Sequence, residues 1–146
     1  MAAKCRGILR FVFDTNVLVS AALKPGGKPG RCLAVAMGMG KILLSDPTVL
    51  ELSDVLLRDK FDRYATRESR EAFFVSFVEE KASVIETSER IRACRDPNDD
   101  KFLEVAVSGK ADYLIMGDQD LLVLHPFRGI PILKPATFMA EVQKER

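Results

Sequence analysis

The chain has 146 residues, of which 47% are hydrophobic and 29% are charged. This composition excludes an intrinsically disordered chain, and the length predicts a single domain over residues 1–146 with its own core. Its 22 basic and 21 acidic side chains give a net charge of +1. No overall basic field therefore attracts polyanions, and a nucleic acid would need a local patch.

The cysteines and the N-terminal residues indicate where the protein works. Cys5, Cys32 and Cys94 are an odd number without a CxxC pair, so we expect neither a disulfide framework nor a cysteine zinc site. Residues 1–10 do not resemble a signal peptide, because the apolar stretch after them is soon interrupted by Asp14. No run reaches the roughly 18 apolar residues of a membrane helix. We expect a cytoplasmic protein without a membrane partner.

Apolar runs alternate along the chain with segments of helical periodicity. Residues 8–13 are rich in Phe, Val, Ile and Leu, which predicts a strand buried on both faces. Further strands are expected at 41–45, 82–86, 113–116 and 130–133. Helices are expected at 16–23, 31–39, 67–81 and 135–144, and two more begin at Asp46-Pro47 and Asp96-Pro97. This alternation predicts βαβ units and one parallel sheet.

Carboxylates follow several of the predicted strands. Asp14 ends the first apolar run, Glu51 comes shortly after the second, and Asp118 follows the run at 113–116. In a parallel sheet these side chains converge on the edge where open α/β sheets place their ligands. Because close, unneutralised carboxylates repel each other, their convergence indicates a site for divalent cations.

Each of these acids also has a purely structural interpretation. Asp14, Thr15 or Asn16 could cap the helix that follows, since all three side chains satisfy free helix N–H groups. We assign Asp14 to the metal and Asn16 to orienting neighbouring carboxylates. Glu51 could simply be a solvated helix residue, and Asp46 is better explained as an N-cap.

A second group of acids opens the helix near residue 97. Asp96, Asp99 and Asp100 stand at i, i+3 and i+4, and so share a face if the helix reaches back that far. Acids in a first turn are also favoured by the helix macrodipole, and Asp96 is assigned to capping. Three carboxylates in one turn repel each other, and a metal would relieve that repulsion. Asp120 is a weaker candidate beside Asp118.

Residue types exclude several other chemistries. His125 is the single histidine, which rules out a two-histidine ribonuclease mechanism and an HExxH zinc site. The chain has no GxSxG elbow and no GK[ST] phosphate loop. Basic residues near the acids, among them Arg58, Lys60 and Arg95, are weak candidates for contacts to RNA phosphates.

Four segments resemble the PIN domain, the fold of VapC-type ribonuclease toxins and of several RNA-processing nucleases. They read FVFDTNVLVS from Phe11, LSDPTVLEL from Leu44 with LRDKF from Leu57, DPNDDKFLE from Asp96, and ADYLIMGDQDL from Ala111. Their order and spacing cover nearly the whole chain. The last two segments and the RDKF sequence resemble most closely the toxins of toxin–antitoxin pairs.

The resemblance implies a three-layer α/β/α fold with about five parallel strands, and hydrolysis of RNA with Mg²⁺ or Mn²⁺. An antitoxin partner and a homodimer are further expectations for this family. The four acidic positions match Asp14, Glu51, Asp100 (with Asp99 as a possible substitute) and Asp118 (with Asp120 close by). Met116 stands where relatives usually carry Ser or Thr, which affects the expected rate rather than the site.

Three alternatives remain open from the sequence. A degenerate PIN domain would bind RNA or a partner without cutting, and Met116 is its best support. A receiver-type phospho-acceptor domain would explain the Lys134-Pro135 pair, but an acidic pair at the first strand and an Asp at the third are missing. A haloacid-dehalogenase-like phosphatase would need an acid where Asn16 stands.

Overall fold

The computed structural model describes residues 8–144. The prediction that residues 1–10 are not a signal peptide falls mostly on residues outside this range. Cys5 also lies outside it. The strands are β1 (Leu9–Phe13), β2 (Gly40–Leu44), β3 (Ala82–Val84), β4 (Tyr113–Ile115) and β5 (Ile132–Leu133). The helices are α1 (Thr15–Leu23), α2 (Lys28–Met39), α3 (Asp46–Leu56), α4 (Arg67–Ser76), α5 (Asp100–Ser108), α6 (Gln119–Leu122) and α7 (Pro135–Lys144). Short helical turns occupy η2 (Asp59–Phe61), η3 (Phe77–Lys81) and η4 (Pro97–Asp99).

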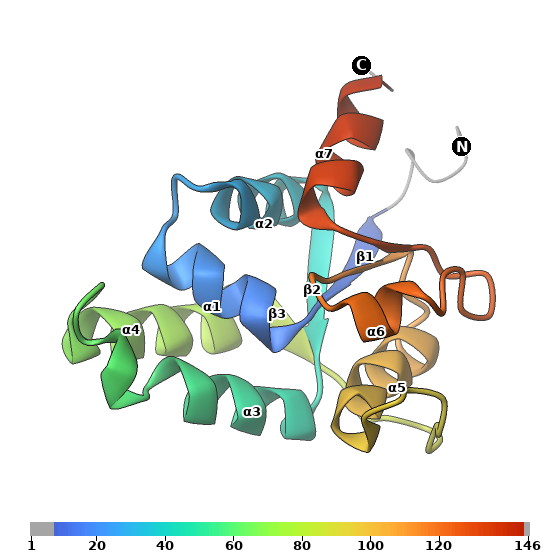
Figure 1. Ribbon diagram of the computed structural model, residues 1–146, viewed down its shortest axis with the longest axis horizontal. Coiled ribbons are helices and arrows are strands. Elements are labelled where there is room, and N and C mark those ends of the chain that lie inside the picture. The colour runs from blue at the N-terminus through green and yellow to red at the C-terminus, as the bar shows by residue number, and fades with distance from the viewer. Residues whose placement is uncertain (1–7, 145–146) are drawn as a thin grey trace.

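The strands form one parallel sheet in the order β3-β2-β1-β4-β5. Figure 1 shows α1, α3 and α4 on one side of this sheet and α5 and α6 on the other. Each side has its own hydrophobic cluster, one built around Phe11, Leu52 and Phe138, the other around Phe102, Leu103 and Leu114. The predicted three-layer α/β/α fold is therefore confirmed.

The strand order creates a switch point beside the central strand. The chain steps outward from β1 to β2 and β3, and then crosses to β4 and β5 on the other side of β1. Open α/β sheets bind ligands where the strand order reverses in this way, outside the carboxyl ends of the strands. At this point the backbone N–H of Asp14 donates to the carbonyl of Ile115 at 3.0 Å, so the ends of β1 and β4 are directly joined.

The structure differs locally from the sequence predictions. The strands expected at 82–86 and 130–133 are shorter, and the helix expected from Asp96-Pro97 is the turn η4 followed by α5. Helix α2 begins at Lys28 rather than at residue 31, because Pro29 sits in its first turn, where a missing N–H has no cost. Helix α3 is capped by Ser45, so the assignment of Asp46 as N-cap is wrong. The side chains of Ser45 and Thr48 accept each other's backbone N–H in a capping box, and Asp46 is the first helical residue. The short helix α6 was not predicted.

Gly40 is needed where β2 begins. A Cβ added there would lie 1.9 Å from the carbonyl oxygen of Leu9, its partner on β1. Its φ of 177° is ordinary extended backbone, so lack of space rather than dihedral strain excludes a side chain. Within residues 8–144, no helix combines the length and the apolar character needed to cross a bilayer.

Candidate functional site

Asp14 stands at this switch point, directly after β1. Its side chain caps α1 by accepting the N–H of Val17 at 2.8 Å, and its second oxygen accepts the N–H of Gly117 at 3.3 Å. The side chain is only 4% exposed. Burial raises its pKa from 3.8 to about 6 against these two hydrogen bonds, and the charges of Asp118 and Asp99 raise it further. Capping and a functional role are thus not exclusive, since one oxygen serves the cap.

Asp118 comes from the next strand, after β4. It caps the short helix α6 by accepting the N–H of Asp120 at 2.9 Å. Its charge acts on both Asp14 and Asp99. Asp120 lies at the margin of this group, where its carboxylate is 4.0 Å from the guanidinium of Arg95. The strand end therefore delivers Asp118 to the same place as Asp14, as the sequence predicts.

The neighbouring acids Asp99 and Asp100 have different partners, and their pKa values shift in opposite directions. Burial raises the pKa of Asp99 to about 6, and the carboxylates of Asp118, Asp96 and Glu51 add to this rise. Burial also acts on Asp100, but its pKa is lowered overall because its carboxylate accepts the N–H groups of Cys94 and Ala93 at 2.8 and 3.1 Å. Asp99 thus belongs electrostatically with Asp14, Asp118 and Glu51, whereas Asp100 holds the preceding chain segment.

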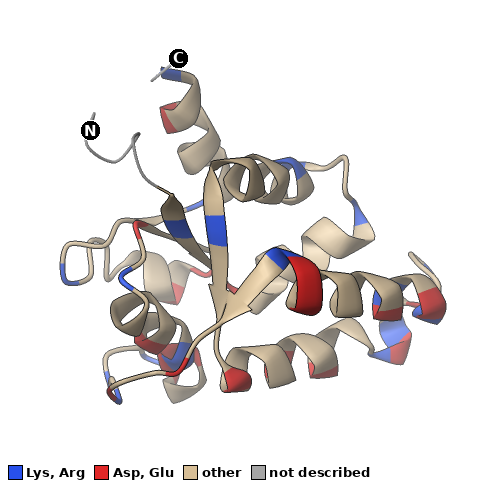
Figure 2. Cartoon of the chain, turned by 180° about the vertical axis from the view of Figure 1, so that it is seen from behind, with Lys and Arg blue, Asp and Glu red and all other residues tan. Residues whose placement is uncertain are grey.

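Glu51 reaches the site from α3 and is joined to a lysine. The ammonium of Lys101, on α5, forms an ion pair with the Glu51 carboxylate, and both side chains are largely buried. Lys101 also lowers the pKa of Asp99. Figure 2 shows acidic and basic residues interleaved on α5 and the segment before it. Lys101 is a functional candidate that the sequence reasoning missed, although it directly follows the acids at the start of α5.

The four carboxylates fit the chemistry of a hard divalent cation, which prefers oxygen ligands. Asp14, Glu51, Asp99 and Asp118 carry like charges that interact, and the raised pKa values of Asp14 and Asp99 reflect in part the repulsion that a cation would relieve. In the described part of the chain, no three acids, histidines or cysteines are gathered closely enough to hold a metal as they stand. Side chains would therefore have to rotate, above all Glu51 away from Lys101.

Three residues named with the site have different surroundings. Thr15 is buried in the first turn of α1, whereas Asn16 is exposed. Asn16 makes no hydrogen bond to the acids among the contacts of residues 8–144, so nothing here supports its role in orienting carboxylates. Met116 is fully buried in the cluster beneath α5 and α6. Its position two residues before Asp118 is therefore filled by an apolar side chain rather than a hydroxyl.

The basic residues Arg58 and Lys60 follow the C-terminal end of α3, at the opposite end of that helix from Ser45. Arg58 pairs with Asp54 at 3.0 Å, and the ammonium of Lys60 lies 5.1 Å from the ring centre of Phe61. Of the three basic candidates, only Arg95 contacts an acid of the site, Asp120.

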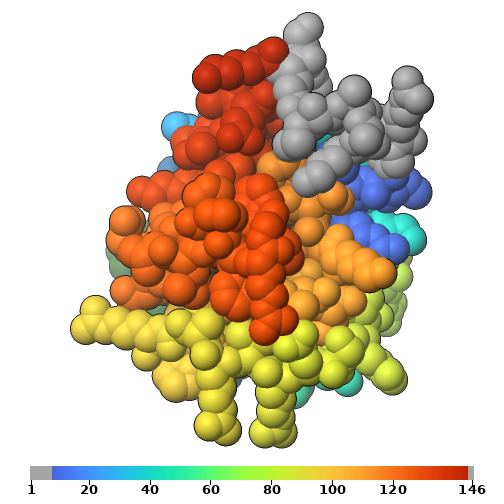
Figure 3. Space-filling view, turned by 90° about the vertical axis from the view of Figure 1, so that its right-hand side faces the viewer, coloured from blue at the N-terminus to red at the C-terminus, as the bar shows by residue number. Residues whose placement is uncertain are grey.

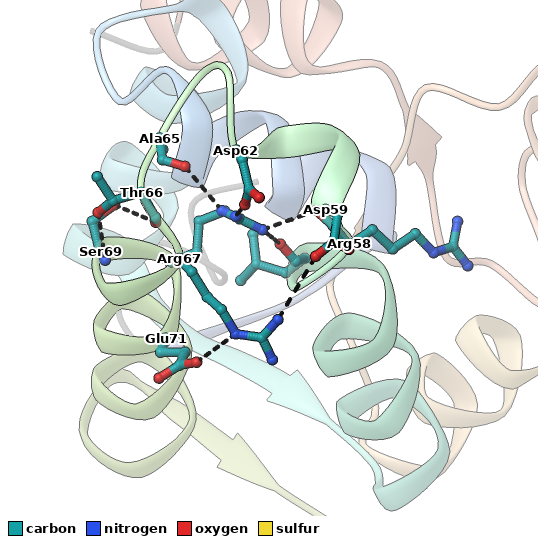
Figure 4. A network of polar contacts seen from close by, with 10 residues as sticks. Arg58, Asp59, Asp62, Ala65, Thr66, Arg67, Ser69 and Glu71 are labelled. Atoms are coloured by element: carbon teal, nitrogen blue, oxygen red, sulfur yellow. Dashed lines mark hydrogen bonds and ion pairs between the residues drawn. The ribbon is translucent and has the colours of Figure 1, made fainter.

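The turn that carries Arg58 and Lys60 is fixed by a buried arginine. Arg70, on α4, is 1% exposed and donates to the carbonyls of Leu56, Arg58 and Ala65 at 2.8, 3.1 and 3.2 Å. It also forms an ion pair with Asp62. Figure 4 shows three of these partners, Arg58, Asp62 and Ala65, within the turn between α3 and α4. Arg70 therefore serves the fold, since it satisfies three backbone carbonyls at once.

Comparison with known proteins agrees with this geometry. The chain is an α/β protein with interacting carboxylates at the switch point of a parallel sheet. Residues 10–120 match the model of the PIN domain. The chain therefore belongs to the PIN domain family. It is 32% identical to the uncharacterized protein MJ1680 of Methanocaldococcus jannaschii over 117 residues, which are 80% of this chain and 75% of that protein.

A solved structure shares the fold. A chain in the crystal structure of VapBC2 from Rickettsia felis, bound to a DNA fragment from its promoter, superimposes with a TM-score of 0.58. The match covers 86% of this chain and 98% of the other, at 13% sequence identity. Both the predicted fold and the predicted family are confirmed by these comparisons.

Proposed function

We propose that the protein is a ribonuclease that hydrolyses RNA phosphodiester bonds with Mg²⁺ or Mn²⁺. The observation that carries the proposal is the convergence of Asp14, Asp99, Asp118 and Glu51 at the switch point of the sheet, with the pKa of Asp14 and of Asp99 raised to about 6. PIN domains are typically nucleases, and the family membership favours this reading over a receiver-type or phosphatase domain.

The side chains divide the work between them. Asp14, Asp99, Asp118 and Glu51 would hold the cation, and a bound cation supplies Lewis-acid activation of water and neutralises charge on the phosphodiester. Asp99 is proposed ahead of Asp100 because the Asp100 carboxylate already accepts two backbone N–H groups. Lys101, once Glu51 turns away from it, is placed to bind a phosphate oxygen of the substrate.

The experiment compares Asp118→Asn with Asp54→Asn. Asn at 118 keeps an oxygen to cap α6 and loses the charge, whereas Asp54 is exposed on α3 and pairs only with Arg58. Isothermal titration with Mn²⁺ should show that Asp118→Asn weakens binding about tenfold or more. The same variant should lose Mn²⁺-dependent cleavage of a fluorescent mixed-sequence RNA, and Asp54→Asn should behave as the unmodified protein.

Three results separate the outcomes. Full cleavage by Asp118→Asn would refute the catalytic assignment. Binding of Mn²⁺ without cleavage of any RNA would favour the degenerate PIN domain, in which Met116 replaces the usual hydroxyl. Absence of Mn²⁺ and Mg²⁺ binding would refute the metal site itself.

We further propose that the protein is the toxin of a toxin–antitoxin pair, acts in the cytoplasm as a homodimer and is held inactive by an antitoxin protein. The fold shared with a chain of the VapBC2 structure supports this setting. Induced expression should arrest bacterial growth, and Asp118→Asn should abolish the arrest while the protein still accumulates. Unaffected growth would count against toxicity. Light scattering of the purified chain at monomer mass would count against the homodimer.

A further inference from the structure

A cavity of about 800 Å³ lies beside the acidic site, and none of the acids proposed as metal ligands lines it. Its walls are the segment before α5, the first turns of α5, and Pro47 at the start of α3. Figure 3 shows this segment as a yellow-green band along one face of the molecule, with side chains projecting outward. The volume falls within the about 300–1,000 Å³ typical of small-ligand pockets.

The negative charges on the cavity wall are already engaged. The Asp100 carboxylate accepts the N–H groups of Ala93 and Cys94, and the Glu104 carboxylate accepts the N–H of Ile91 at 3.0 Å. These bonds hold the irregular segment against α5 by its backbone. The acids therefore help to build the wall, and one oxygen of each carboxylate accepts main-chain N–H groups.

The positive side chains on the same wall make no close ion pair, although the charge of Arg92 helps to lower the pKa of Asp100. Arg90 and Arg92 line the cavity and are exposed, and neither guanidinium forms an ion pair with any acid between residues 8 and 144. Lys101 lines the cavity too, while its ammonium pairs with Glu51 of the acidic site. The lining thus carries Arg90, Arg92 and Lys101 against Asp100 and Glu104, an excess of one positive charge, and Lys101 connects it to the proposed catalytic carboxylates.

The remaining lining defines the chemistry of the ligand. Pro47 and Pro97 offer apolar surface, and the Asn98 amide offers both a donor and an acceptor. Guanidinium groups can contact phosphates and stack on bases, and an amide can bond the edge of a base, which are contacts that proteins use for single-stranded RNA. Protein ligands of acidic character would use the arginines but not this combination.

We propose that this cavity binds a nucleotide of the RNA strand next to the scissile phosphate, with Arg90 and Arg92 on the flanking phosphates. The proposal rests on the ribonuclease function proposed above and adds a substrate site to it. The cavity positions the strand so that the adjoining phosphate reaches the acids at the ends of β1 and β4.

The test measures binding of a fluorescent 12-nucleotide mixed-sequence RNA by anisotropy, in an Asp118→Asn background that leaves the RNA intact. The double variant Arg90→Gln/Arg92→Gln should weaken binding about tenfold at 0.15 M salt and lower the slope of log K against log salt by about 1.4, the value for two phosphate contacts on a single strand. The control is Lys28→Gln/Arg31→Gln on α2, with the same charge change.

A second readout locates the base directly. RNA that contains 4-thiouridine should cross-link to residues 87–98, and the double variant should lose that cross-link. An acidic decapeptide of equal charge should compete poorly; equal competition would mean that the cavity recognises charge alone and would overturn the proposal.

The failure of this site and of the proposed function are distinguishable. If the unmodified protein cleaves RNA but Arg90→Gln/Arg92→Gln binds RNA like the control, the cavity proposal fails and the ribonuclease stands. If no cleavage occurs with Mn²⁺, the function fails, and the cross-link alone decides whether RNA occupies the cavity.

Discussion

Replacement of Asp14 by Asn should stabilise the metal-free protein at neutral pH. The pKa of this carboxyl is raised from 3.8 to about 6 in the folded chain, first by burial and then by neighbouring carboxylates. Folding therefore takes up protons between these values. The contribution of this carboxyl to the free energy of unfolding is fully present below pH 3.8 and is lost as the pH rises through about 6. An uncharged Asn does not incur this loss.

The size of the effect follows from the contacts of the side chain. The difference between 3.8 and about 6 corresponds to about 3 kcal/mol at pH 7.5. Asn keeps the cap to Val17, because Asn and Asp are equally good N-caps. Its amide group would face the N–H of Gly117, now 3.3 Å from the second oxygen, at a cost of about 1 kcal/mol. A net gain of about 2 kcal/mol remains, or about 4–8 °C in Tm.

The assay is thermal and urea unfolding in EDTA at pH 4, 6 and 7.5. Asp14→Asn should be destabilised by about 0.5 kcal/mol at pH 4, where little of the electrostatic gain is present to offset the lost hydrogen bond, and should show the full gain at pH 7.5. Asp54→Asn should stay within about 0.5 kcal/mol throughout. Saturating Mn²⁺ should reverse the order, since it stabilises the unmodified protein more than the variant. If Asp14→Asn is less stable than the unmodified protein at pH 7.5 in EDTA, the inference that the ionised Asp14 carboxylate destabilises the metal-free fold is refuted.

Further substitutions test the neighbouring assignments. Asp99→Ala should weaken Mn²⁺ binding about tenfold with little loss of stability. Asp100→Ala should cost about 2 kcal/mol in urea unfolding, because it removes the oxygen that accepts two backbone N–H groups; a larger loss of Mn²⁺ affinity in Asp100→Ala would reverse the assignment. Arg70→Met should cost about 3 kcal/mol or more by leaving buried carbonyls without donors. Arg67→Met, on the same helix but exposed, should cost under about 1 kcal/mol. Gly40→Ala should cost about 2–3 kcal/mol, read as a lower Tm, because its methyl group meets the backbone of β1.

The fold was predictable because its signals are local and repeated. Strand β1 is a continuous apolar run, and the helices on both faces carry apolar residues at helical spacing, so the parallel sheet followed from pattern alone. The wrong N-cap assignment arose where two residues suited to an N-cap are adjacent in the sequence. Ser45 and Asp46 both suit an N-cap, and only the bonds exchanged with Thr48 decide between them.

The site was only partly predictable, because side-chain direction depends on contacts far away in sequence. Asp14 and Asp118 follow strands, and the sheet delivers them together. Asp99 and Asp100 have the same chemistry and adjoining positions, so the sequence could not separate them; the backbone of residues 93 and 94 does. The pair Glu51–Lys101 joins residues 50 positions apart, and no pattern in the sequence predicts it.

The way the segment before α5 is attached has a consequence for how this protein could diversify. The carboxylates of Asp100 and Glu104 accept hydrogen bonds from the main-chain N–H groups of Ile91, Ala93 and Cys94. Every residue except proline supplies such an N–H group. The side chains at 90, 92 and 98 can therefore be exchanged without dismantling the support beneath them. The segment therefore has a fixed main chain that can carry different side chains, and libraries confined to these positions would vary the lining of the cavity without changing its support.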